Sequence, residues 1–274
     1  VGGNLTVTSG NVSGITDSGT VTVAGNLVAT TDDNNGVIDL GQMAVDGTVA
    51  LTTNGNGAAT IVNDAGLNFA ASTVTGALSA TATTGDITDS GNLTITGAAT
   101  FITGVDESNI VLDSSGNAFS SSVEMRADAG GEDFGNITFV DSAGIDFATS
   151  AGSNGDLYIN SSTDGTVGGN LSVTATTGNI TDTVAVVTTG SSTSSFTTSA
   201  TNGTITLNTP ASLAGAVTLS TTGASGNATI DNGTTALNIA ASSIGGNLTV
   251  TSGAGAGITD SGTVTVAGNL VATT

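Results

Sequence analysis

A short motif containing one carboxylate recurs along this chain and is its clearest candidate for chemistry. The triplet Ile-Thr-Asp occurs four times and supplies the aspartates Asp17, Asp89, Asp182 and Asp260. Such a series could form an outward ladder of ligands. An aspartate that follows a threonine can also cap a turn by accepting hydrogen bonds from its own backbone. Because the motif recurs once in each of three sub-repeats, as a corner residue would, we predict a structural turn role for these four aspartates.

Two acidic clusters are candidates for calcium, which prefers several oxygen ligands. The first is the polar turn that contains Asp32 and Asp33, and the second contains Asp128, Glu132 and Asp133. Neither has the regular spacing of a known calcium loop. Solvated turns are therefore the alternative interpretation for both clusters.

The residue types that most enzymes need are missing from the sequence. It contains no His, Cys or Lys, which excludes thiol nucleophiles, Schiff bases and Ser-His-Asp triads. Paired carboxylates could hydrolyse glycosides, but sugar clefts favour aromatic platforms and Tyr158 is the only Tyr or Trp. We therefore predict that the chain is not an enzyme and needs no cofactor. A carbohydrate-active β-helix enzyme is a remote alternative. An ice-binding solenoid is another, because pairs of threonines spaced two apart occur along the chain, although at irregular intervals.

Charge restricts the partners. One basic residue stands against 22 acidic ones, and the formal net charge is −21. The chain cannot form a basic phosphate-binding surface, so we expect neither nucleic acid nor an anionic membrane as a partner. No run of 18 apolar residues could insert into a bilayer. The absence of cysteine fits an extracellular bacterial protein, and a start at Val1 without a signal segment suggests part of a longer protein.

The local pattern predicts β-strands throughout. Short runs of β-branched and small aliphatic residues alternate with Gly, Asn, Asp and Ser, which is a strand signal with turn punctuation. No window keeps the apolar spacing of a helix. The runs span residues 36–40, 48–52, 59–62, 109–112, 136–140, 157–160, 204–208 and 216–220.

A long repeat organises these strands. Residues 2–31 and 245–274 are identical at 27 of 30 positions. The Ile-Thr-Asp motifs begin at Ile15, Ile87, Ile180 and Ile258, which indicates three diverged sub-repeats of unequal length in each unit. We expect residues 1–274 to form one continuous domain: a unit of about 243 residues (2–244) followed by the start of the next (245–274). The least repetitive segment, 104–135, contains Arg126 and is expected to leave the regular stack.

Three all-β architectures fit a long repeat: tandem sandwiches, a propeller or a β-solenoid. Sandwich cores usually need bulky aromatic anchors, whereas aromatic residues are 3% of this chain. Val, Ile, Leu, Ala and Thr can fill a narrow solenoid coil, and Gly and Asn suit its tight corners. We therefore predict a parallel β-helix of roughly 12–14 coils, each about 20 residues long.

The segments GGNLTVTSG, GDITDSGNLTITGAATF, LAGAVTLSTTGASGNATI and GTTALNIAASSIGGNLTV resemble the repeats of filamentous-haemagglutinin-like and β-strand-repeat surface exoproteins of bacteria. The resemblance implies a right-handed parallel β-helix that is secreted to the cell surface. It also implies a structural repeat module of an adhesin, extracellular filament or biofilm matrix, whose partners are neighbouring repeats or copies of itself. A self-assembling S-layer, sheath or matrix-fibre subunit, joined end to end without covalent linkage, is the main alternative.

Overall fold

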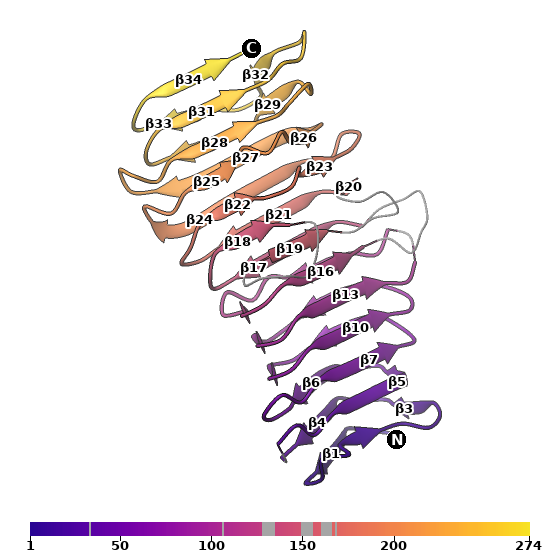
Figure 1. The fold of residues 1–274 in the computed structure, drawn as a ribbon. Helices are drawn as coiled ribbons and strands as arrows, with labels where there is room; N and C mark the ends of the chain where they lie inside the picture. Colours follow the sequence, from indigo (N-terminus) through magenta and orange to yellow (C-terminus); the bar gives the residue numbers. More distant parts are fainter. Residues whose placement is uncertain (33, 106, 128–134, 149–155, 160–165, 168) are drawn as a thin grey trace.

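The computed structural model describes residues 1–274 except 33, 106, 128–134, 149–155, 160–165 and 168. Parallel strands are stacked into a β-solenoid of about 11 turns, and the described chain contains no helix (Figure 1). The all-β solenoid predicted from the sequence is confirmed. No part of the described chain therefore offers a helix long and apolar enough to cross a bilayer.

Sheet A contains 17 of the described strands and runs the length of the stack. Its strands are β1 (Leu5–Ser9), β4 (Leu27–Thr31), β6 (Thr48–Thr52), β8 (Leu67–Phe69), β9 (Ser72–Val74), β11 (Ile87–Asp89), β12 (Leu93–Ile95), β14 (Ile110–Leu112), β15 (Ala118–Phe119), β17 (Ile137–Asp141), β21 (Leu171–Ala175), β24 (Ser194–Thr201), β27 (Ala216–Thr222), β29 (Leu237–Ile239), β30 (Ser242–Ile244), β32 (Ile258–Asp260) and β33 (Val264–Val266).

Sheet B contains 14 of the described strands, and a smaller sheet C contains three. The strands of sheet B are β2 (Ile15–Thr16), β3 (Val21–Val23), β5 (Ile38–Val45), β7 (Ala59–Asn63), β10 (Leu78–Ala82), β13 (Ala99–Thr103), β16 (Val123–Arg126), β18 (Ile145–Phe147), β19 (Asp156–Ile159), β22 (Ile180–Asp182), β25 (Ile205–Leu207), β28 (Ala228–Asp231), β31 (Leu248–Thr251) and β34 (Leu270–Thr273). Sheet C consists of β20 (Thr166–Val167), β23 (Val187–Thr188) and β26 (Ser212–Leu213).

Most coils pass once through sheet A and once through sheet B and then stack in register on the coil before them, whereas the coil between β17 and β21 contributes both β18 and β19 to sheet B. Leu5 pairs with Leu27 in the next coil, and Ile137 pairs with Leu171 after a much longer step. Both steps exceed the coil length that was assumed from the sequence. The stack consequently has about 11 turns where 12–14 were expected.

Alternation along the strands fills a narrow core. In β4 the side chains of Leu27, Ala29 and Thr31 are buried, while Val28 faces outward. Small aliphatic residues occupy most of the interior, and the bulkiest side chains are stacked phenylalanines in the middle coils. Phe69 and Phe101 meet edge to face with ring centroids 6.2 Å apart, a favourable aromatic geometry.

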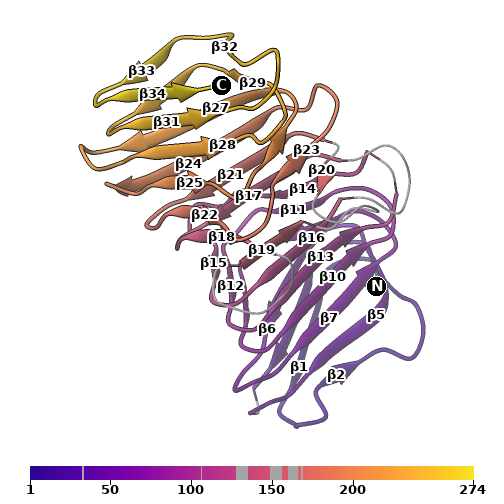
Figure 2. The same cartoon turned by 45° about the horizontal axis from the view of Figure 1, so that its top comes forward.

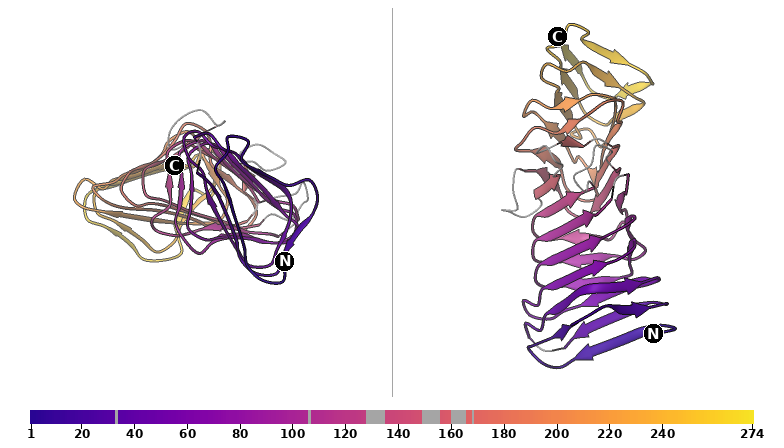
Figure 3. Two further views of the ribbon diagram at one scale, coloured as in Figure 1. Left: turned by 90° about the horizontal axis from the view of Figure 1, so that it is seen from below. Right: turned by 90° about the vertical axis from the view of Figure 1, so that its right-hand side faces the viewer.

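A typical coil has one continuous strand on one side and two short strands on the other. In the first coil β1 is continuous on sheet A, and β2 and β3 divide sheet B. Later coils reverse this arrangement: β10 is continuous on sheet B, and β11 and β12 divide sheet A (Figure 2). Figure 3, seen along the stack, shows the indigo N-terminal coils and the yellow C-terminal coils extending to different sides.

The middle coils are the least regular. Within 104–135, β14, β15 and β16 continue the stack on β11, β12 and β13, while residues 106 and 128–134 of the predicted excursion lie outside the described part. The longest steps between paired strands lie in this region, from Ile137 to Leu171 in sheet A and from Ile145 to Ile180 in sheet B. The extra length of the sub-repeat that runs from Ile87 to Ile180 is therefore accommodated largely within this region.

Candidate functional site

The Ile-Thr-Asp aspartates bind the coil that follows them. Asp89 accepts the backbone N–H of Asp113 on Oδ1 at 2.9 Å and the side-chain amide of Asn117 on Oδ2 at 2.7 Å. The backbone N–H of Ser114 lies 3.3 Å from Oδ2. A carboxylate that receives several donors holds them strongly, because hydrogen bonds to charged acceptors exceed neutral ones. Asp89 therefore fastens one coil to the next, and we call this arrangement a coil clamp.

Two other motif aspartates make equivalent contacts. Asp17 Oδ2 accepts the N–H of Gln42 at 2.7 Å, and Asp182 Oδ1 accepts the N–H of Asn208 at 2.9 Å. Asp260 lies in the last coil, is exposed, and has no hydrogen-bond partner for its carboxylate among the described residues. The sequence suggested caps within a turn. The acceptors instead serve a neighbouring coil, because parallel stacking places its N–H groups over the carboxylate.

Burial changes the acidity of one clamp. Desolvation raises the pKa of Asp182, and the charge of nearby Asp146 raises it further, while the N–H groups of Asn208 and Thr209 oppose the shift. Burial favours the neutral acid because a carboxylate loses its hydration there. The Asp182 clamp is therefore a partly desolvated acceptor.

The clamps alternate between the two sides of the solenoid. Their strands β2, β11, β22 and β32 lie in sheets B, A, B and A in turn. From β2 the stack continues through β5, β7 and β10, and the next motif then follows on the opposite sheet. Each of the three sub-repeats thus contains three and a half coils, although the sub-repeats differ in length.

Three buried polar residues lie at or directly after the end of a strand and bond to the last residue of a strand in the preceding coil. Asn63 accepts the N–H of Val45 at 2.8 Å, and Asn232 accepts the N–H of Leu213 at 2.8 Å. Asp141 occupies the equivalent place and accepts the N–H of Phe119 at 3.3 Å. Burial raises the pKa of Asp141, against the effect of hydrogen bonds from Ala143, Phe119 and Ser142. All three side chains satisfy an N–H group that would otherwise be buried without a partner.

A ladder of side-chain amides follows one corner of the middle coils. Asn136 donates its backbone N–H to Oδ1 of Asn109 at 2.8 Å and accepts the N–H of Asn170 at 2.8 Å. The sequence analysis missed this ladder, although asparagines directly before the first apolar residue of a strand indicate it. Its members are Asp86, Asn109, Asn136, Asn170 and Thr193.

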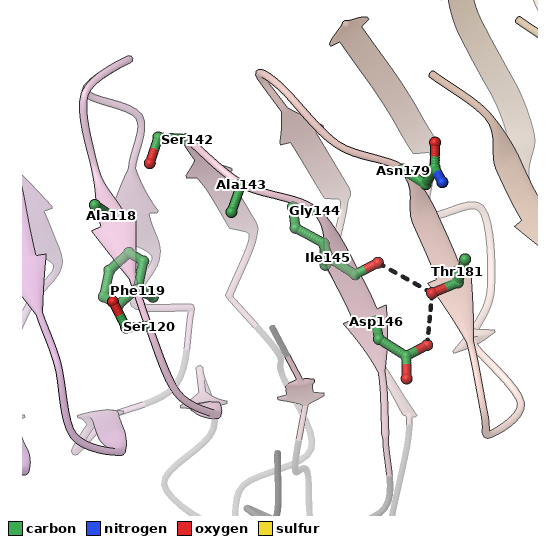
Figure 4. Close-up of a pocket in the computed structure, with 10 residues that line it drawn as sticks. All are labelled: Ala118, Phe119, Ser120, Ser142, Ala143, Gly144, Ile145, Asp146, Asn179 and Thr181. Atoms are coloured by element: carbon green, nitrogen blue, oxygen red, sulfur yellow. Dashed lines mark hydrogen bonds between the residues drawn. The ribbon is translucent and has the colours of Figure 1, made fainter. Parts of the chain in front are cut away.

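A cavity of about 530 Å³ lies beside β15 and β18 (Figure 4). Asp146 is the one carboxylate in its lining, and Thr181 donates to Oδ1 of Asp146 at 2.8 Å. Glycoside hydrolysis needs two carboxylates, and the described lining brings no second one into the cavity. The lining residues are Ala118, Phe119, Ser120, Ser142, Ala143, Gly144, Ile145, Asp146, Asn179 and Thr181.

The predicted calcium residues fall largely outside the described part of the chain, which does not include Asp33, Asp128, Glu132 and Asp133. Asp32 is exposed, and its backbone N–H donates a hydrogen bond to the backbone carbonyl of Ser9 at 2.9 Å. The described residues contain no group of three or more potential metal-binding side chains. The Arg126 guanidinium lies 3.5 Å from the Glu124 carboxylate, as a partly buried ion pair.

The two nearly identical end segments differ in how they are covered: β4 is followed in the stack by β6, whereas β34 is the last strand of its sheet. Leu27 in the first copy is 1% exposed beneath the next coil, whereas its equivalent Leu270 is 59% exposed. An open hollow of about 330 Å³ lies at the C-terminal end, with Ile258, Val264 and Leu270 in its lining. The C-terminal edge therefore exposes the apolar groups that the same sequence buries at the N-terminal end.

One family model matches this chain. It is described as "Repeats of unknown function (DUF5649)" and matches residues 56–126 and 225–274. No curated protein matches the sequence. No solved structure matches it either.

Proposed function

We propose that this chain is a structural repeat segment of a large secreted bacterial surface protein, an adhesin or an extracellular filament, and that it acts as a rigid rod. The observation that carries the proposal is the relation between its ends. β1 pairs with β4, and at the other end of the chain their sequence repeats β31 and β34 pair in the same register. The last coil of the chain thus repeats the strand pairing of the first coil, as expected for one segment of a longer stack of repeats.

The bonds between coils support a mechanical role. Coil clamps, the amide ladder and backbone pairing all act along the stack, so each coil is stabilised by its neighbours. Open strand edges at the ends of a sheet invite further pairing. A next unit would cover the edge of β34 and fill the hollow at Leu270. The net charge of −21 would keep neighbouring rods apart, because like charges repel.

The proposal is tested with a two-unit chain, residues 1–274 followed by a second copy of residues 32–274. Electron cryo-microscopy should show one uninterrupted rod with strand spacing of about 4.8 Å through the join. Two separate bodies connected by a flexible link would refute the rod.

The alternative is a self-assembling S-layer, sheath or matrix-fibre subunit whose copies join end to end without a covalent link. The exposed Leu270 and Val271 favour it, because an open apolar edge attracts a partner. Analytical ultracentrifugation of the single chain at rising concentration separates the two proposals. Filaments would support separate subunits, and a monomer at all concentrations would support covalent tandem units.

The remaining expectations are proposals of the same kind. The single carboxylate in the cavity lining supports a non-catalytic role, and an activity screen on acidic and neutral polysaccharides tests it. Calcium at the Asp32–Asp33 turn is tested by calorimetric titration of the wild type against the Asp32→Asn/Asp33→Asn variant. Heat that is lost in the variant would support that site.

A further inference from the structure

We propose that the C-terminal edge of the stack binds a second copy of the unit with the two faces of the rod interchanged. Consecutive units then present the same surface on opposite sides. This inference rests on the rod-like function proposed above. It identifies what covers the C-terminal edge: the coil formed by residues 32–53 of the second copy.

The interchange follows from where equivalent strands lie. β1 belongs to sheet A, and β31, which repeats its sequence, belongs to sheet B. β2 and β3 lie in sheet B, whereas their repeats β32 and β33 lie in sheet A. β4 and its repeat β34 differ in the same way. All four equivalent strands therefore change sides from one unit to the next.

An odd number of sub-repeats explains the change. Every sub-repeat contains three and a half coils, so the motif changes sides at each step. Three sub-repeats make ten and a half coils per unit. Two sub-repeats would restore the starting side: residues 59–103 are similar in sequence to residues 228–273, and their first strands β7 and β28 lie in the same sheet.

The seam with the second copy has a defined register. Within the unit, Leu27 of β4 pairs with Val49 of β6, so Leu270 would pair with the second copy's Val49. Asp17 accepts the N–H of Gln42, so the free carboxylate of Asp260 would accept the same N–H of the second copy. Asn26 accepts the N–H of Thr48, and Asn269 would do so across the seam.

The geometry makes the array two-sided. A surface patch carried once per unit emerges on alternate sides of the rod, so an array can contact neighbours or a substratum through both faces. The structural period is then two units, and one unit rises about 50 Å along the axis at about 4.8 Å per coil.

Cysteine labelling tests the interchange without interference from the twist of the stack. The chain has no native cysteine, so maleimide-biotin followed by streptavidin marks chosen positions in electron micrographs. Val28→Cys/Val271→Cys places labels on equivalent outward positions of β4 and β34. Val28→Cys/Ser243→Cys is the matched control, because Ser243 is exposed on β30, in the same sheet as β4 and close to the coil of β34.

The control pair measures the accumulated twist. We expect the label at position 271 to project from the side of the rod opposite to the label at 243. Projection from the same side would overturn the interchange, even though the chain remained a rod.

The two-unit chain separates failure of this inference from failure of the proposed function. A continuous rod whose two copies of Val28 lie on opposite faces, after allowance for twist, is the expected result. A continuous rod with both copies on one face would overturn the interchange alone. Two bodies without a shared stack would overturn both proposals.

Discussion

Asn117 donates its side-chain amide to Asp89 Oδ2 at 2.7 Å, and the two residues belong to successive coils of sheet A. The Asn117 side chain also accepts the N–H of Leu93 at 2.8 Å and is fully buried. One asparagine thus links a clamp carboxylate to a backbone group of the lower coil. The recurring motif acts in the cohesion between coils, which a purely local turn would not provide.

Replacement of Asp89 by alanine should weaken this cohesion. The variant leaves the N–H groups of Asp113 and Ser114 and the Asn117 amide without their charged acceptor. We expect a loss of about 1–3 kcal/mol in the free energy of unfolding and faster hydrogen exchange at Asp113 and Ser114. Asp46→Ala is the control, because Asp46 is exposed and makes no side-chain hydrogen bond among the described residues. Equal effects of both substitutions in urea unfolding would contradict the clamp.

The sequence was sufficient for the fold class and the repeat, because both follow from local spacing. Alternating β-branched runs specify strands, and the near-identity of segments 2–31 and 245–274 specifies the long period. The stacking role of Asp17 and Asp89 could not be read in the same way. Their partners Gln42 and Asp113 lie in the following coil, and coil length must be known before such pairs are recognised.

The alternation of faces was also hidden in the sequence, for a similar reason. Ile15 and Ile258 are separated by about ten and a half coils, and the final half coil decides whether they lie on the same side of the solenoid. Coil lengths also vary, since the coil that begins at Ile137 is much longer than the one that begins at Leu5. A mean coil length cannot resolve half a coil over such a distance. The buried role of Asp141 could have been inferred by aligning segment 137–147 with 59–69, since this places it on Asn63.

Asp141→Asn should stabilise the protein near neutral pH. Burial raises the pKa of Asp141 in the folded protein above that of the unfolded chain. The contribution of this group to stability is therefore fully present below the unfolded value of 3.8 and is lost as the pH rises through the folded value. Asparagine keeps an acceptor for Phe119, as Asn63 and Asn232 do for their partners.

We expect the free energy of unfolding of the variant to exceed that of the wild type by about 1 kcal/mol at pH 7. This difference should disappear toward pH 3. Urea unfolding at a series of pH values measures the difference. A variant that is less stable than the wild type at pH 7 would show that the ionised carboxylate is required there.

The two ends should respond differently to the same substitution. Leu27→Ala removes a side chain that is 1% exposed and should cost about 2–5 kcal/mol. Leu270→Ala in the single chain should change stability little, since Leu270 is 59% exposed. In the two-unit chain the cost at Leu270 should rise toward that at Leu27, because the second unit covers it. An unchanged small cost in the two-unit chain, measured by urea unfolding, would mean that the seam does not form.

Asn136→Ala should open the amide ladder at one rung. The N–H of Asn170 loses its acceptor, and Asn109 loses the side-chain donor 2.8 Å away. Because these groups lie at an exposed corner, water replaces part of the lost bonding, and we expect a cost of about 1 kcal/mol. Hydrogen exchange at the Asn170 amide should accelerate about fivefold to tenfold, in line with that free energy.

Two variants separate the ladder from general effects of substitution. Asn136→Asp retains an acceptor for Asn170 and should leave its exchange closer to that of the wild type, while it loses the donor to Asn109. Thr138→Ala changes an outward residue of the same strand that makes no side-chain hydrogen bond among the described residues, and should leave the Asn170 amide protected. If Thr138→Ala accelerated exchange as much as Asn136→Ala, the protection would come from strand pairing of β17 with β21 and not from the ladder.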